Sequence, residues 1–278
     1  MDNGKKLTSP SPNHYHELTE SSRNVEQVHQ EHHYSCVSLT SLVGGAVILR
    51  ATDPSSKNNL GVNATLLLTF DDTPLKNGRI YVDYYPVAWR VATFPAQGMY
   101  AMTVSYQNQL AFIKPQVSGD IVVSVSTWVP IDVAQTTDLQ TLPETGYAFT
   151  PPRNLPAGSR VIQAVNKTKS IQAIGIGFDN GKSFPPPTTL LFEGVGADSS
   201  VTAEFTPSLA AYVVSDYKQN EVLRGAIQSP VIWKQDIALL GQDSSFALTR
   251  DASGRYTLTP DRNLWKAADK GSMVHVLP

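Results

Sequence analysis

The feature that most constrains this sequence is an alternation of apolar and polar residues with a period of two. In the segment 120–129, Ile121 and Val123 fall on one face of an extended chain and Ser124 falls on the other. Turn signals recur about every 8 to 14 residues, and no long helical pattern separates the strand-like runs. The sequence therefore predicts an all-β fold of the antiparallel β-sandwich or barrel type.

Several neighbouring runs have the pattern of hairpins. The β-rich segments 64–70 and 79–85 flank a loop that ends in an Asn-Gly turn dipeptide, and 245–250 and 255–259 flank an Asp-Ala-Ser-Gly turn. We expect both pairs to form hairpins. The segment 208–224 is predicted as a strand, with a helix as the alternative, because helix formers gather in its second half.

Composition divides the chain into four parts. Residues 1–40 are rich in histidine and poor in large apolar residues, so we expect a disordered tail that does not contribute to the core. Four prolines interrupt 143–158, which is typical of a linker. The expected organisation is a tail, a β domain at 41–142, this linker and a second β domain at 159–278.

The two predicted domains share short segments in the same order. Residues 65–68 resemble 189–192, and 112–114 resemble 232–234. An internal duplication would explain these matches, and it predicts that the two β domains are similar.

Charge and hydropathy exclude several classes of partner. Charged residues make up only 17% of the chain and the formal net charge is -2, so no basic surface is available for nucleic acid. No apolar run approaches the length of a transmembrane helix, and the first residues lack the apolar stretch of a secretory signal. We therefore expect a cytoplasmic protein.

Few residues suited to catalysis lie outside the tail. The chain has six histidines and one cysteine, and only His275 lies outside the first 40 residues. A catalytic triad would therefore have to recruit His275 or a histidine of the tail, and a zinc site of histidine and cysteine ligands cannot be assembled within the predicted β domains. If the protein is an enzyme, Asp71 and Asp72 are the candidate catalytic carboxylates, and the same pair is the candidate calcium site.

The tail holds the candidate ligands for a transition metal. His29 and His33 would share one face if this part became helical, and Cys36 lies close by in the sequence. Apart from these two candidate metal sites, no cofactor is expected.

Aromatic side chains cluster before residue 95. Tyr81, Tyr85 and Trp89 combine apolar area with polar groups, which suits the recognition of a glycan or a protein surface. The sequence favours a non-enzymatic β-sandwich protein that binds such a ligand or assembles into a homo-oligomer. The alternatives are a cofactor-free enzyme of the cyclase or isomerase type and a membrane-active or coat-forming β protein.

Overall fold

The computed structural model describes residues 45–51, 60–70, 80, 82–98, 100–107, 109–144, 146–179, 184–204, 207–241 and 243–261. These residues form β-strands and one short 3-10 helix, Ile237–Leu239, so the predicted all-β fold of sandwich type is confirmed. The predicted tail, 1–40, lies outside the described residues. Within the described ranges, no helix is long and apolar enough to cross a membrane.

Two of the four sheets form what we call sandwich 1. One sheet has the order β18-β17-β1-β5, with the bounds β18 (Tyr256–Pro260), β17 (Asp243–Arg250), β1 (Gly45–Ala51) and β5 (Ala101–Tyr106). The other has the order β16-β15-β2-β4, with the bounds β16 (Val231–Asp236), β15 (Ser208–Val214), β2 (Ala64–Thr69) and β4 (Arg90–Phe94). Trp233 and Phe246 join the two sheets, with ring centroids 4.9 Å apart.

The other two sheets form sandwich 2. One has the order β10-β8-β11-β14, and β9 also pairs with β8; the bounds are β10 (Arg153–Asn154), β8 (Gln135–Leu142), β11 (Ile162–Asn166), β14 (Ser200–Ala203) and β9 (Gly146–Phe149). The second has the order β3-β13-β12-β6-β7, with β3 (Tyr85–Pro86), β13 (Thr188–Val195), β12 (Gln172–Asp179), β6 (Gln109–Ser118) and β7 (Ile121–Ile131). Phe112 and Phe149 face each other between the sheets, with centroids 6.5 Å apart.

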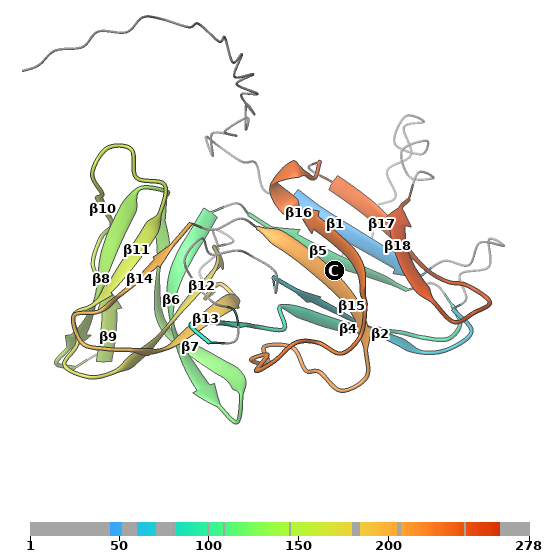
Figure 1. The fold of residues 1–278 in the computed structure, drawn as a ribbon, viewed down its shortest axis with the longest axis horizontal. Coiled ribbons are helices and arrows are strands. Elements are labelled where there is room, and N and C mark those ends of the chain that lie inside the picture. The colour runs from blue at the N-terminus through green and yellow to red at the C-terminus, as the bar shows by residue number, and fades with distance from the viewer. Residues whose placement is uncertain are drawn as a thin grey trace, which may run out of the picture. The chain divides into compact units, whose positions relative to one another are not determined.

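The two sandwiches have the same strand topology (Figure 1). The sheet β16-β15-β2-β4 corresponds to β7-β6-β12-β13, and each neighbouring pair in both is antiparallel. The sheet β18-β17-β1-β5 corresponds to β9-β8-β11-β14, and the central pair is parallel in both. The correspondence keeps the order of the chain. The first eight equivalent strands are β1, β2, β4, β5, β6, β7, β8 and β9, and their counterparts in the same order are β11 to β18.

This correspondence changes the residue alignment expected for an internal duplication. The segment 65–68 lies in β2, whose counterpart is β12, whereas the sequence match placed it on β13. The segment 112–114 lies in β6, whose counterpart is β15 and not β16. The duplication itself stays a prediction, but the matches that suggested it join strands that are not equivalent. Short apolar strings recur in any β-rich chain, because many strands need the same residue types.

The predicted linker does not separate two sets of sheets. The segment 143–158 contains β9 and β10, both paired with β8, and each of the four sheets holds strands from before and after it. This corrects the expected boundary. Sandwich 2 takes its strands from 109–204 together with the short β3, whereas sandwich 1 is built from the residues on both sides of that stretch. The four prolines lie outside β9 and β10, in turns and connections, where a missing N–H group costs little.

Aromatic residues connect the cores of the two sandwiches. Phe70 follows β2 and Phe178 lies at the equivalent place in β12, and their ring centroids are 5.2 Å apart. Trp89 packs against both, at 5.2 Å from Phe70 and 6.3 Å from Phe178. All three side chains belong to one buried cluster that includes residues of both sandwiches.

One predicted hairpin is confirmed and the other is wrong. β17 and β18 pair around a turn in which Asp251 accepts hydrogen bonds from the backbone N–H groups of Ser253 and Arg255. β2, in contrast, pairs with β4 and β15, and the tyrosine at the end of the predicted partner run lies in β3, which pairs with β13. The strands that pair with β2 therefore come from beyond the predicted partner run, at 90–94 and 208–214.

The expected alternation in 120–129 holds only in part. The pairing of β6 with β7 shifts twice, and each shift leaves one extra residue, Val123 or Ser126, in β7. Such bulges move the following residues to the opposite face. Val123 is accordingly 58% exposed and Val122 is buried, which corrects the predicted inward face. The segment 208–214 is the strand β15, as predicted.

Candidate functional site

Trp89 is a core residue. Its side chain is 1% exposed, and its indole Nε1 is buried without a hydrogen-bond partner. It lies on the short connection between β3 and β4, where the period-two pattern of a single strand no longer indicates which side chains point outward. This corrects the prediction that Trp89 presents its ring to a ligand.

Tyr85 is half-buried, and one of its faces is occupied. The guanidinium of Arg224 lies 4.6 Å from the centroid of its ring. Arg224 also donates hydrogen bonds to Asp120, at 2.7 Å, and to Glu193, at 2.9 Å. These hydrogen bonds, that to Glu193 first, raise the pKa of Arg224 although burial opposes them. Arg224 therefore connects β3, the β6–β7 turn and β13, and the ring of Tyr85 is one of its contacts.

The other predicted site residues lie outside the described residues. These are Tyr81, Asp71, Asp72 and the three candidate metal ligands His29, His33 and Cys36. Among the side chains that the structure does describe, no group of three or more histidine, cysteine, aspartate or glutamate residues is placed to hold a metal ion.

A polar cluster in sandwich 2 is the arrangement best suited to ligand recognition. We call it the Lys114 cluster, and it consists of Lys114, Tyr147, Thr168, Ser170 and Gln172. Its members come from β6, β9, β12 and the loop between β11 and β12. The cluster begins inside the sandwich and ends at the surface, because Lys114, Thr168 and Gln172 are buried, Tyr147 is half-buried and Ser170 is exposed.

Lys114 is the charged member of the cluster. It is 8% exposed and lies two residues after Phe112, so both side chains point from β6 into the sandwich. Its Nζ donates to the carbonyl oxygen of Pro115 at 3.3 Å and lies 5.0 Å from the ring centroid of Tyr147. Burial lowers the pKa of Lys114, because the interior of the protein disfavours the charged ammonium.

Gln172 connects the other polar groups. Its Nε2 donates to Tyr147 Oη at 3.3 Å, to Thr168 Oγ1 at 3.2 Å and to Ser170 Oγ at 2.8 Å. An amide nitrogen has two hydrogens, so these three acceptors share them. The hydroxyl groups retain lone pairs and rotatable hydrogens, and they can exchange partners when a polar ligand arrives.

Asn166 fixes the loop that carries Thr168 and Ser170. Its side chain is fully buried, and its Nδ2 donates to the carbonyl oxygens of Ser170, Val195 and Gly196 at 2.9, 2.8 and 3.1 Å. Its Oδ1 accepts from the backbone N and the hydroxyl of Thr168, at 3.0 and 2.7 Å. The hydroxyl groups of the cluster are therefore positioned by a saturated amide rather than by a free loop.

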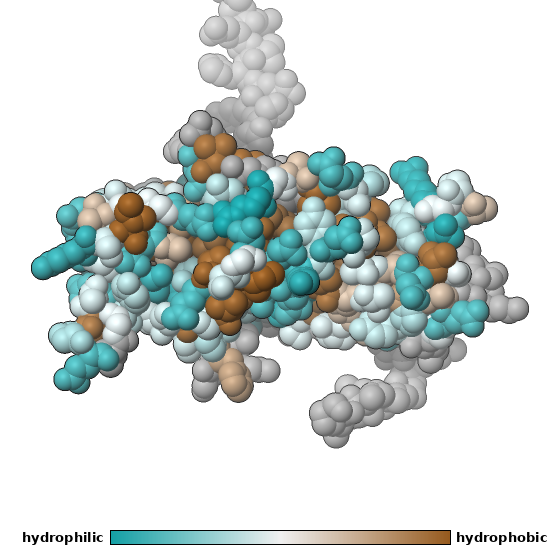
Figure 2. Space-filling model, turned by 90° about the horizontal axis from the view of Figure 1, so that it is seen from below, coloured by the Kyte–Doolittle hydropathy of each residue, from teal (hydrophilic) through white to brown (hydrophobic). Residues whose placement is uncertain are grey.

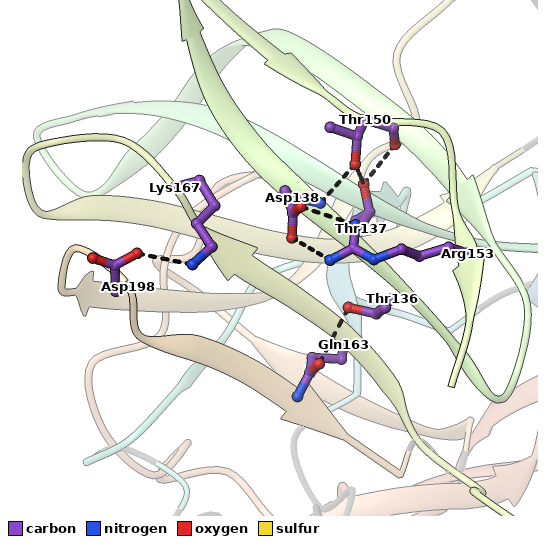
Figure 3. Close-up of polar contacts among 8 residues, drawn as sticks. All are labelled: Thr136, Thr137, Asp138, Thr150, Arg153, Gln163, Lys167 and Asp198. Carbon is purple, nitrogen blue, oxygen red and sulfur yellow. Dashed lines mark hydrogen bonds and ion pairs between the residues drawn. The ribbon is translucent and has the colours of Figure 1, made fainter. Parts of the chain in front are cut away.

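Ion pairs brace the same part of sandwich 2 from outside (Figure 3). Lys167 joins Asp198 at 2.9 Å and so connects the loops after β11 and β13. Arg153 makes a two-pronged pair with Asp138, at 2.9 and 2.8 Å, which holds β10 on β8. The hydrogen bond to Asp198 raises the pKa of Lys167, whereas the pKa of Lys114 is lowered. The surface cations drawn there have carboxylate partners, and the buried lysine of the cluster has none among the described residues.

Sandwich 1 lacks this cluster at the equivalent positions. When the equivalent strands of the two sandwiches are aligned by their registers, Lys114 corresponds to Val213 of sandwich 1. Tyr147 corresponds to Tyr256, and Gln172 corresponds to Ala64. The tyrosine is thus common to both sandwiches, whereas the lysine and the glutamine are replaced by apolar residues. The polar groups of the cluster are therefore not a requirement of the fold.

The Lys114 cluster was not predicted from the sequence. A signal was present, because Lys114 directly follows the apolar run 110–113 in what reads as a buried strand. Gln172 and Tyr147 carry no such signal, since polar residues next to turns are common. Only the packing of β9 over β6 brings them together.

No protein-family model, no curated protein and no solved structure matches the chain.

Proposed function

We propose that the protein is a binding protein that recognises a glycan at the Lys114 cluster. The observation that carries this proposal is the difference between two equivalent positions on one scaffold. At these positions sandwich 1 has the apolar residues Val213 and Ala64, whereas sandwich 2 has Lys114 and Gln172. Buried polar and charged groups reduce the stability of a fold, so their presence where apolar residues fit is expected for a site that is used.

The chemistry of the cluster suits a sugar. Sugar hydroxyl groups need donors and acceptors close together, and Gln172, Thr168 and Ser170 supply both. The C–H faces of a sugar ring pack well on an aromatic ring, and Tyr147 supplies a half-buried one with a polar tip. Asn166 and the outer ion pairs hold these groups on rigid elements, which limits the entropy lost on binding.

A protein surface is the second candidate ligand. Figure 2 shows apolar residues in patches between hydrophilic ones on one face of the molecule. The most exposed large apolar side chains are Phe184, Ile171, Leu239 and Val123. These four side chains come from separate segments of the chain and do not by themselves define an interface. We therefore propose a glycan before a protein surface as the ligand. A carboxylate enzyme would rest on Asp71 and Asp72, which lie outside the described residues.

Binding to a glycan array tests the proposal. We expect the full chain to bind at least one glycan, and Gln172→Ala to weaken that binding by tenfold or more, because it installs the residue of sandwich 1 and removes the central donor. Gln163→Ala is the matched control, since Gln163 is hydrogen-bonded to Thr136 and Thr202 on the outer face of the β8-β11-β14 sheet. If the full chain binds no glycan, or if both variants bind as well as the native chain, the proposal is wrong.

A further inference from the structure

Lys114 is an incompletely satisfied cation. An ammonium has three donor hydrogens, and the described part of the chain offers it one carbonyl oxygen, at 3.3 Å, and the face of a tyrosine ring. By contrast, Arg153, Lys167 and Arg224 each pair with a carboxylate at less than 3 Å, although all three are far more exposed. The least solvated of these four cations is thus the one without an anionic partner in the described residues.

Among the residues that the structure describes, no neighbouring strand supplies an anion to Lys114. Tyr147 is the titratable group that faces Lys114 from β9. β7 presents Thr127 beside it, and β12 contributes Gln172 to the cluster. Burial is the cause of the lowered pKa of Lys114, with no contribution from a nearby charge. The site therefore has one positive charge and neutral hydrogen-bonding groups around it.

We infer that the glycan bound at the Lys114 cluster carries a carboxylate, as a uronic acid or another acidic sugar does, and that this carboxylate pairs with Nζ of Lys114. This inference rests on the proposed function and names its ligand class. A carboxylate matches the single charge of the lysine and accepts the hydrogens for which the described residues supply no acceptor. A phosphate monoester carries nearly two negative charges at neutral pH and would need a second cation, which the cluster does not have.

Binding of this kind has a protonation signature. In the free protein, burial weakens the hold of Lys114 on its proton. A bound carboxylate favours the ammonium, so the pKa of Lys114 rises when the acidic sugar binds. A neutral sugar in the same place supplies no charge and leaves this pKa low.

The first experiment compares acidic glycans with neutral copies of themselves. The full chain is applied to an array of uronic-acid and other carboxylated glycans, each printed beside the same glycan with its carboxyl group reduced to an alcohol. We expect the acidic form to bind about tenfold to a hundredfold more tightly, as charge-assisted hydrogen bonding to a buried cation predicts. Lys114→Met is expected to remove this preference, and Lys169→Met, which removes an exposed lysine of the same loop, is expected to keep it.

The second experiment measures the proton directly. In an NMR titration of the lysine Nζ signals, the pKa of Lys114 is expected to rise when the preferred acidic glycan is added and to stay unchanged with its reduced copy. Equal binding of both forms would overturn this inference and leave the proposed function intact. Equally tight binding of a sulfated glycan would overturn the assignment to a carboxylate. If no glycan of any kind binds, the proposed function fails as well.

Discussion

The two sandwiches of this protein have one strand topology but different interiors. In sandwich 1 the space between the sheets is filled by Trp233 and Phe246, and in sandwich 2 by Phe112 and Phe149. These two aromatic pairs lie on strands that are not equivalent. For example, the residue of sandwich 1 that corresponds to Phe112 is Ala211. Interiors of similar topology can be filled in different ways as long as their total volume is kept.

The difference extends to polarity. Sandwich 1 carries apolar side chains where sandwich 2 carries Lys114 and Gln172. Backbone pairing sets the frame in both, and the frame tolerates either set of residues. Strand pairing accounts for the fold of both sandwiches, and the proposed function rests on the residues by which sandwich 2 differs from sandwich 1.

The largest effect is expected where the two sandwiches meet. Trp89→Ala should lower the free energy of unfolding by about 3–5 kcal/mol, because it leaves a cavity between Phe70 and Phe178. Urea denaturation followed by circular dichroism measures this. Trp128→Ala, at a half-buried position on β7, should cost less. If the Trp89 variant is the more stable of the two, the shared aromatic core does not hold the sandwiches together.

Equivalent core positions should cost equal amounts. Leu139 of β8 and Leu248 of β17 occupy corresponding places, and both are 0% exposed. We expect Leu139→Ala and Leu248→Ala each to lower the free energy of unfolding by about 3 kcal/mol. Denaturation midpoints of the two variants under identical conditions provide the comparison. A large inequality would show that the two cores are not equivalent in packing.

Two asparagines next to loops, Asn166 of sandwich 2 and Asn63 of sandwich 1, are expected to differ in their contribution to stability. Asn166 is buried and makes five hydrogen bonds, whereas Asn63 is exposed and accepts one, from the backbone N of Ala96 at 2.8 Å. Asn166→Ala should cost about 2 kcal/mol, since it leaves buried carbonyl and hydroxyl groups without partners. Asn63→Ala should cost less than about 1 kcal/mol. Thermal unfolding of both variants checks this, and equal melting temperatures would contradict it.

Lys114 links stability to pH. Lys114→Met keeps the shape of the side chain and removes its charge, so it should stabilise the protein by about 1 kcal/mol at neutral pH. The pKa of Lys114 is lower in the folded protein than in the unfolded chain, whose value is near 10.5. Between these two pKa values the unfolded chain holds more protons, so the native protein gains stability as pH rises.

The advantage of the Lys114→Met variant should therefore be largest below the folded pKa of Lys114 and shrink as pH approaches 10.5. Denaturation of both proteins across this range measures the difference, and the tyrosines that also ionise there are common to both. An advantage that stays constant with pH would mean that the charge of Lys114 costs nothing in the fold.

The smallest effect is expected on the outer face of sandwich 2. Asp138→Ala installs the residue that sandwich 1 has at the equivalent position, Ala247, and breaks the pair with Arg153. The side chain of Arg153 is 53% exposed, so water already solvates much of this pair, and the loss of stability should be the smallest of those expected here. A double-mutant cycle with Arg153→Ala isolates the coupling. A coupling as large as the cost of Asn166→Ala would show that the pair is more important to sandwich 2 than its exposure suggests.

Local pattern was sufficient for some elements and insufficient for others. The β17–β18 hairpin was predictable, because its turn residue Asp251 hydrogen-bonds its own backbone within the loop. The pairing of β2 with β15 was not predictable, because β15 lies far along the chain. No local pattern indicates that the apolar faces of these two strands belong to one sheet. The exposed side of β7 was missed for a related reason, since its bulges arise from the register with β6.

The candidate site shows the same division. The sequence placed the aromatic candidates Tyr85 and Trp89 on a surface, because alternation along one strand was assumed to continue through a segment that changes sheets. It did not single out Tyr147 and Gln172, whose roles depend on a hydrogen bond between two sheets. Among the residues of the cluster, only Lys114 has a recognisable signal in the sequence, as a charge at the end of an apolar run, and this signal was not used.

By itself, the sequence determined the strand character of this protein, its low charge and the absence of histidine and cysteine from most of its length. These properties follow from residue type and from the period of two, which act over a few neighbouring residues. Only the tertiary structure decided which strands pair, that 143–158 divides no sheet, and that a lysine, a tyrosine and a glutamine from three strands meet inside one sandwich. The physical reason is that long-range pairing is selected by the burial of whole sheet faces, which no local window contains.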